Sequence, residues 1–116
     1  MGLARDLRSR RVIPLREVVV AAWANEEGVP FTLYCTAISC YDLDQLQKKH
    51  PKFLESTTIG AMVDLILMKA TDEGGEKLFK HAEDRIDLMG EETAVISDIA
   101  NQMFVEIESV ENQIKN

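Results

Sequence analysis

The sequence contains few of the residues on which many enzymes and secreted domains depend. Its 116 residues include two cysteines, two histidines, one tryptophan and three prolines. The two cysteines, Cys35 and Cys40, are too few for a secreted disulfide scaffold, and they lack the Cys-x-x-Cys spacing typical of zinc and thioredoxin-type centres. A glycine-rich phosphate loop and a dinucleotide fingerprint are also missing. We therefore expect no cofactor and no metal.

Long apolar runs are also missing. The best candidate, residues 59–70, is interrupted by Asp64 and Lys69, whereas a membrane span needs roughly 18 apolar residues in a row. The first arginines are not followed by the apolar run of a secretory signal. We therefore expect a cytoplasmic protein with no membrane partner.

The charge is unevenly distributed around a formal net value of −7. Residues 1–16 carry five arginines and one aspartate, which gives +4, and residues 17–116 carry eight basic and 19 acidic residues, which gives −11. We predict a basic, flexible N-terminal arm over residues 1–16 and a single α+β domain over residues 17–116. The acidic domain repels nucleic-acid phosphates. Because an arginine-rich end without aromatics is a weak nucleic-acid signal, the candidate contacts there are only Arg5, Arg8, Arg10 and Arg11, and a solvated arm is the favoured interpretation.

The first half of the domain has the pattern of a hairpin and a capped helix. Residues 17–24 are β-branched and residues 31–38 alternate in polarity, which predicts two strands joined by a turn. Ser39 and Asp42 have the spacing of a helix capping box. The helix that follows should end near His50, because the next residue is proline.

The second half of the domain is predicted to be helical. Residues 59–70 place apolar side chains on one helical face after a cap at Thr57 or Thr58, and residues 71–76 form a turn. A short helix over residues 80–89 should end at Gly90, and a long amphipathic helix begins near Thr93. The fold class is therefore α+β, with an N-terminal β-hairpin, a bundle of three to four α-helices and a long C-terminal amphipathic helix.

Candidate catalytic groups are weak. His50 and His81 lie beside lysines in polar stretches and are expected to be exposed on the surface. Glu83 and Asp87 share a helical face, as acidic surface pairs commonly do. Residues 72–77 fail as a calcium loop, because Gly74 and Lys77 occupy positions that need an oxygen ligand and a glycine. We expect no catalytic residues, and thus a protein that is not an enzyme.

The C-terminal helix carries an apolar seam longer than a small domain needs. Its members recur at steps of three and four residues: Ile96, Ile99, Met103, Ile107, Val110 and Ile114. Either the whole seam belongs to the core, or part of it packs on a partner helix. The residue pattern leaves both interpretations open.

The order of these elements resembles the tail assembly chaperones of long-tailed bacteriophages. The resemblance extends over roughly residues 17–105. It includes the strand ending in Val20-Ala21-Ala22-Trp23, the stretch from Leu67 to Phe79 that contains Asp72-Glu73-Gly74-Gly75-Glu76, the sequence Leu88-Met89-Gly90-Glu91, and a last helix through residues 101–104. The junction Thr36-Ala37-Ile38-Ser39 and the basic arm depart from the family pattern.

This resemblance implies a non-enzymatic function in the host cytoplasm. Such chaperones bind the long tape measure protein and keep it soluble while tail tube protein polymerises around it, and they are absent from the finished virion. Tail tube protein is a further implied partner, and we also expect self-association. Under this hypothesis the contact with the tape measure protein is formed by Met62, Leu65, Ile99, Met103, Ile107 and Val110.

Two other functions fit the same sequence. A structural phage tail protein, such as a tail terminator, a connector or a minor tail subunit, would have a similar size and composition, and it would be found in purified virions. A small nucleic-acid-binding regulator would depend on the basic arm alone, and its salt-sensitive retention on DNA would disappear when residues 1–12 are deleted.

Overall fold

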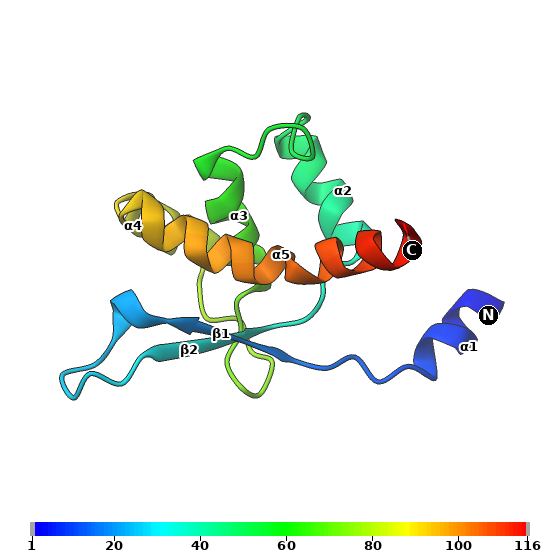
Figure 1. The fold of residues 1–116 in the computed structure, drawn as a ribbon, viewed down its shortest axis with the longest axis horizontal. Helices are drawn as coiled ribbons and strands as arrows, with labels where there is room; N and C mark the ends of the chain where they lie inside the picture. Colours follow the sequence, from blue (N-terminus) through cyan, green and yellow to red (C-terminus); the bar gives the residue numbers. More distant parts are fainter. Residues whose placement is uncertain (1, 116) are drawn as a thin grey trace.

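The computed structural model describes the backbone of residues 2–115 and the side chains of residues 2–104. It confirms the predicted α+β fold, a two-stranded antiparallel hairpin with helices packed beside it (Figure 1). In chain order the elements are α1 (Leu3–Ser9), β1 (Arg16–Val20), the 3-10 helix η1 (Ala21–Trp23), β2 (Phe31–Cys35), α2 (Cys40–Lys49), α3 (Ile59–Lys69), α4 (His81–Met89) and α5 (Thr93–Lys115).

Both strands of the hairpin are shorter than the sequence predicted. Val18 pairs with Leu33, and the residues that alternate with them along each strand face away from the core. The first strand ends at Val20, because η1 turns Trp23 toward the ring of Phe31, at a centroid distance of 6.2 Å. The second strand ends at Cys35, after which the chain turns toward the start of α2.

The predicted helix boundaries in the middle of the chain are confirmed. Ser39 and Asp42 form the capping box of α2, and the helix ends at the C-cap His50, before proline. Thr58, one of the two predicted caps, accepts a hydrogen bond from the backbone N–H of Ala61 at the start of α3. Because these caps satisfy N–H groups that a helix leaves without partners, they fix where α2 and α3 begin.

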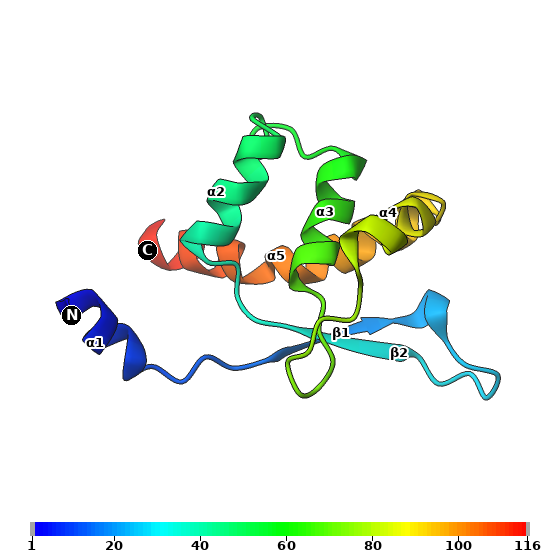
Figure 2. The ribbon, with the colours of Figure 1, turned by 180° about the vertical axis from the view of Figure 1, so that it is seen from behind.

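Helix α3 lies at the centre of the molecule and packs against α2, α4 and α5. Helix α5 in turn lies along β1, so the hairpin and the helices share one core (Figures 1 and 2). The largest fully buried side chains come from all these layers: Phe53, Leu33, Leu46, Leu65, Ile66, Ile96, Ile99, Met103, Val18, Val20, Val63 and Cys35. The prediction of a helix with an apolar face over residues 59–70 is confirmed by α3.

A side-chain amide joins α5 to the outer edge of the hairpin. The side chain of Gln102 accepts a hydrogen bond from the backbone N–H of Val19 at 3.1 Å and donates one to the carbonyl oxygen of Val19 at 3.0 Å. Arg16 donates to the carbonyl oxygen of Gln102 at 3.0 Å. These contacts satisfy backbone groups on the free edge of β1 with which a further strand would otherwise pair, and they set the position of α5.

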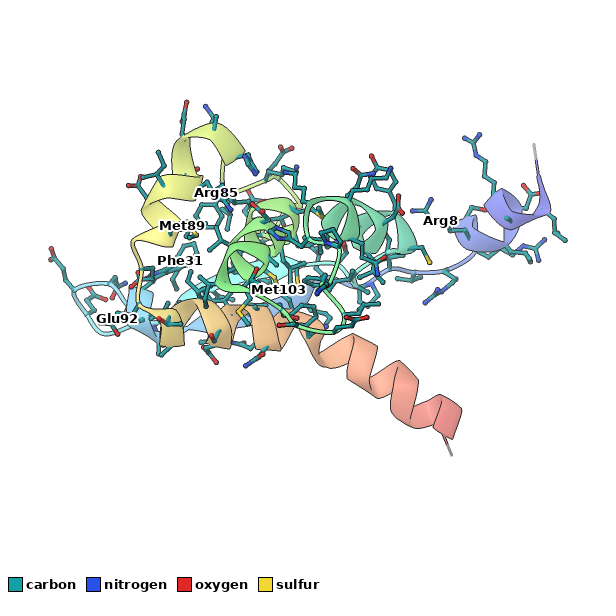
Figure 3. All side chains as sticks on the ribbon, turned by 90° about the horizontal axis from the view of Figure 1, so that it is seen from above. Arg8, Phe31, Arg85, Met89, Glu92 and Met103 are labelled. Carbon is teal, nitrogen blue, oxygen red and sulfur yellow. The ribbon has the colours of Figure 1, made fainter. Side chains whose placement is uncertain are left out.

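The segment predicted as a flexible arm contains a helix that the sequence analysis did not predict. Helix α1 buries none of its residues and lies apart from the helices of the body, beyond an extended linker that enters β1 (Figures 1 and 2). At the other end of the chain, α5 continues to Lys115, and seen from above its last turns run past the other elements (Figure 3).

Candidate functional site

Three of the six predicted partner contacts belong to the protein's own core. Leu65, Ile99 and Met103 are fully buried, because α3 and α5 pack against each other. Their assignment to an exposed contact surface is therefore corrected. Met62 is partly buried against the same core, and its sulfur accepts a hydrogen bond from the Ser97 hydroxyl at 3.8 Å. Ile107 and Val110 lie outside the residues whose side chains the structure describes.

The four predicted nucleic-acid contacts all lie in or next to α1. Arg5, Arg8, Arg10 and Arg11 are exposed. Three of them, Arg5, Arg8 and Arg11, line a shallow hollow together with Ser9 and Ile13. The arm therefore exposes apolar side chains as well as positive charge, whereas contact with phosphates would need only the charge.

A buried aspartate organises a charged cluster that the sequence analysis did not identify. Asp64 lies in the middle of α3 with its side chain 7% exposed. Its Oδ2 lies 2.8 Å from Nε2 of His50, its Oδ1 accepts a hydrogen bond from Nε of Arg85 at 2.9 Å, and Nε2 of His81 lies 3.3 Å from the same Oδ1. The cluster thus joins α3 to the end of α2 and to α4.

The electrostatics of this cluster favour a charged aspartate. Burial alone would raise the pKa of Asp64, but the hydrogen bonds from Arg85 and His50 and the positive charge of Arg85 outweigh it, so that its pKa is lowered. The hydrogen bond with Asp64 in turn raises the pKa of Arg85. A buried acid is tolerated when it is paired and hydrogen-bonded in this way.

The predicted exposure of His50 is wrong. Its side chain is 22% exposed and contacts Asp64, whereas the side chain of His81 is 54% exposed. A polar neighbourhood in the sequence placed both histidines on the surface, but the turn after α2 brings His50 back to α3. The sequence signal for this contact was the aspartate within an otherwise apolar helix, because a buried carboxylate needs a partner.

A small pocket opens beside the cluster. It encloses about 190 Å³ and has an apolar floor with two lysines and a histidine around it. Its lining residues are Leu46, Lys49, Asp64, Leu67, Met68, Lys77, Phe79 and His81. This described lining contains no serine, threonine or cysteine beside the histidine, so it offers no hydroxyl or thiol nucleophile for a histidine base to activate. The cluster holds α2, α3 and α4 together.

A second ion pair connects the beginning of α2 with the end of α3. Lys69 donates to Asp42 Oδ2 at 2.8 Å and to the Thr36 hydroxyl at 2.9 Å. The same Asp42 oxygen accepts the backbone N–H of Ser39. Burial alone would raise the pKa of Asp42, but the hydrogen bonds from Lys69 and Ser39 lower it. Asp42 therefore acts in both the capping box and the packing of two helices.

The end of the molecule opposite α1 combines exposed apolar and acidic side chains. We call it the acidic end and define it by the exposed apolar residues Val29, Phe31, Ile86 and Met89, the exposed acids Glu26, Glu27, Asp87 and Glu92, and the partly buried Trp23 and Glu91. Figure 3 shows Phe31, Met89 and Glu92 at this end, with Arg8 of α1 at the other. A hydrogen bond from Trp23 Nε1 to Glu91 at 2.8 Å connects η1 to the start of α5, and it lowers the pKa of Glu91.

Comparisons with protein families, with curated proteins and with solved structures found no match to this chain. Among the described residues, no helix has both the length and the apolar character needed to cross a membrane. Within the same part of the chain, no three His, Cys, Asp or Glu side chains are grouped so that they would hold a metal ion.

Proposed function

We propose that this protein is a tail assembly chaperone of a long-tailed bacteriophage. It binds the tape measure protein in the host cytoplasm, keeps it soluble during tail assembly and is absent from the finished virion. Tail tube protein is its second proposed partner. The proposal begins from the sequence resemblance over roughly residues 17–105, and it involves binding without chemistry.

The observation that carries the proposal is the division of α5 into two parts. The part that begins at Thr93 is packed into the core through Ile96, Ile99 and Met103, and the last turns of the helix run beyond the other elements (Figure 3). The apolar seam nevertheless continues in the sequence at Ile107, Val110 and Ile114, at helical spacing. An apolar stripe on a projecting helix is suited to packing on another helix.

This division changes the proposed contact with the tape measure protein, the client of the chaperone. Leu65, Ile99 and Met103 hold the fold together, and Ile107 and Val110 remain as the residues that bind the tape measure protein. The acidic surface of the domain has a complementary function: its net charge of −11 keeps coated complexes from associating with one another.

Co-expression with the tape measure protein of the same phage tests the proposal. We expect the client to be soluble with the wild-type chain and to precipitate with the double variant Ile107→Asp/Val110→Asp. The matched control is Ser109→Asp/Asn112→Asp, which adds the same charge on the opposite side of the helix and should keep the client soluble.

Three results would overturn the proposal. The first is a client that is equally soluble with and without this chain. The second is the chain in purified virions at a stoichiometry typical of a tail component, which would indicate a structural tail protein. The third is salt-sensitive retention on DNA that is lost when residues 1–12 are deleted, which would indicate a nucleic-acid-binding regulator.

A further inference from the structure

The basic arm, residues 1–16, has apolar side chains that nothing in the described structure covers. Leu3 and Leu7 are one helical turn apart on α1 and are 69% and 49% exposed, and Val12, Ile13 and Leu15 follow along the linker, also exposed. No residue of α1 is buried. A solvated charged tail would need only its arginines, so apolar side chains at this spacing indicate a surface that docks.

The acidic end has the complementary composition. Ile86 is 78% exposed, and Phe31 and Met89 are exposed beside acidic residues of the hairpin turn and of the start of α5. The two stretches that contain its residues, 17–31 and 86–92, have no lysine or arginine. Arg85 of α4 is already paired with Asp64, and the exposed apolar side chains beside the remaining carboxylates are suited to a partner that is apolar and of opposite charge.

We propose that the basic arm of one copy docks on the acidic end of a second copy of this chain. Leu3 and Leu7 would pack on the exposed apolar side chains there, and Arg8 and Arg11 would pair with the carboxylates of Glu26 and Glu27. The pocket beside Asp64 and the hollow beside Phe53 are lined by lysines, which repel the arm.

The geometry favours a second copy over the arm's own body. The arm joins the body at Arg16, the first residue of β1, and the acidic end lies beyond the last residue of that strand. The arm and the acidic end are at opposite ends of a molecule whose longest dimension is 48 Å (Figures 1 and 3). The outer edge of β1, along which a returning arm would run, is bonded to Gln102.

Contact between two different surfaces has a consequence for the assembly. Each copy that docks its arm leaves its own acidic end open to another arm, so that association continues until a ring closes or a chain grows. A self-complementary contact would stop at a dimer. The proposal therefore predicts a concentration-dependent series of species and weaker association at high salt, since exposed charges contribute to the contact. It does not depend on the identity of the client.

Sedimentation velocity on the full chain over a range of protein and salt concentrations tests this inference. Arg8→Glu/Arg11→Glu and Glu26→Lys/Glu27→Lys should each weaken association about tenfold in the dissociation constant. The combination of all four substitutions in one chain should restore association, because arm and acidic end are again opposite in charge. The control Glu55→Lys/Glu73→Lys changes two exposed acids elsewhere and should leave association as in the wild type.

The apolar half of the contact is tested by Leu3→Ser/Leu7→Ser. Both side chains are exposed, so we expect an unchanged unfolding temperature and a loss of the higher species. A chain that is monomeric at every concentration, or a four-substitution variant that fails to associate, would overturn the proposal. So would loss of association in the Glu55→Lys/Glu73→Lys control.

Discussion

Removing only the charge of Asp64 tests whether the buried cluster holds the helices together. Asp64→Asn preserves the size of the side chain and one carbonyl oxygen, but the contacts to His50 at 2.8 Å and to Arg85 at 2.9 Å lose their charged acceptor. A hydrogen bond to a charged group stabilises by about 1 kcal/mol more than a neutral one. Loss of the charge from both hydrogen bonds should therefore lower the free energy of unfolding by about 2 kcal/mol.

Solvent reduces this value. The side chain of Arg85 is 36% exposed, so water replaces part of what Arg85 loses, and we expect a destabilisation of about 1.5 kcal/mol at pH 7. The measurement is urea unfolding followed by Trp23 fluorescence and circular dichroism. The matched control is Asp44→Asn, since Asp44 pairs with Lys48 at 3.4 Å while both side chains are more than half exposed. It should cost about 0.5 kcal/mol or less.

The difference between wild type and Asp64→Asn should also depend on pH. Folding lowers the pKa of Asp64, so the unfolded chain binds more protons than the native state at acidic pH and stability increases with pH there. The contribution of Asp64 is complete above its unfolded pKa of about 4 and is lost as the pH falls through the lower folded value. The reasoning is refuted if Asp64→Asn and Asp44→Asn cost the same at pH 7. It is equally refuted if the cost of Asp64→Asn is unchanged at a pH where the native carboxyl is protonated.

Three further predictions concern packing, capping and backbone conformation. Phe53→Ala should cost about 3–5 kcal/mol in urea unfolding because the ring is fully buried, whereas Leu54→Ala at the exposed neighbouring position should cost about 0.5 kcal/mol or less; equal losses would contradict the packing. Ser39→Ala removes the side-chain cap of α2 and should cost about 1 kcal/mol in thermal unfolding, and unchanged stability would refute the importance of the cap. Gly75→Ala places a Cβ at φ +87° and should cost about 1–2 kcal/mol by calorimetry, more than Gly74→Ala; the reverse order would contradict the turn conformation.

Local sequence signals predicted most of the fold. The capping box at Ser39, the cap at Thr58 and the proline after His50 act within a few residues, so they determine helix ends without information from the rest of the chain. The apolar period of residues 59–70 is likewise a local property. The strands were predicted too long, because where they end depends on distant partners such as Phe79, whose ring meets Trp23 at 6.2 Å.

Contacts in the candidate site were harder to predict, because they join residues far apart in the chain. His50 and Asp64 are 14 positions apart, and Arg85 is a further 21 from Asp64. A single charged residue in an apolar helix indicates that a partner exists, but it does not indicate which residue this partner is. The seam of α5 posed the same problem, since Ile99 and Ile107 have equivalent positions in the pattern and only packing against α3 and β1 placed Ile99 in the core.

The sequence by itself determined the hairpin, the four helices that follow it, their order and the caps of α2 and α3. It also determined the separation of charge between a basic arm and an acidic domain, because these properties depend on neighbouring residues and on composition. Only the tertiary structure decided which side of each element faces the core. It paired Asp64 with His50 and Arg85 and placed the basic arm and the acidic end at opposite ends of the molecule. The physical reason is that burial depends on the packing of elements distant in the chain, and one helical period is compatible with several partners.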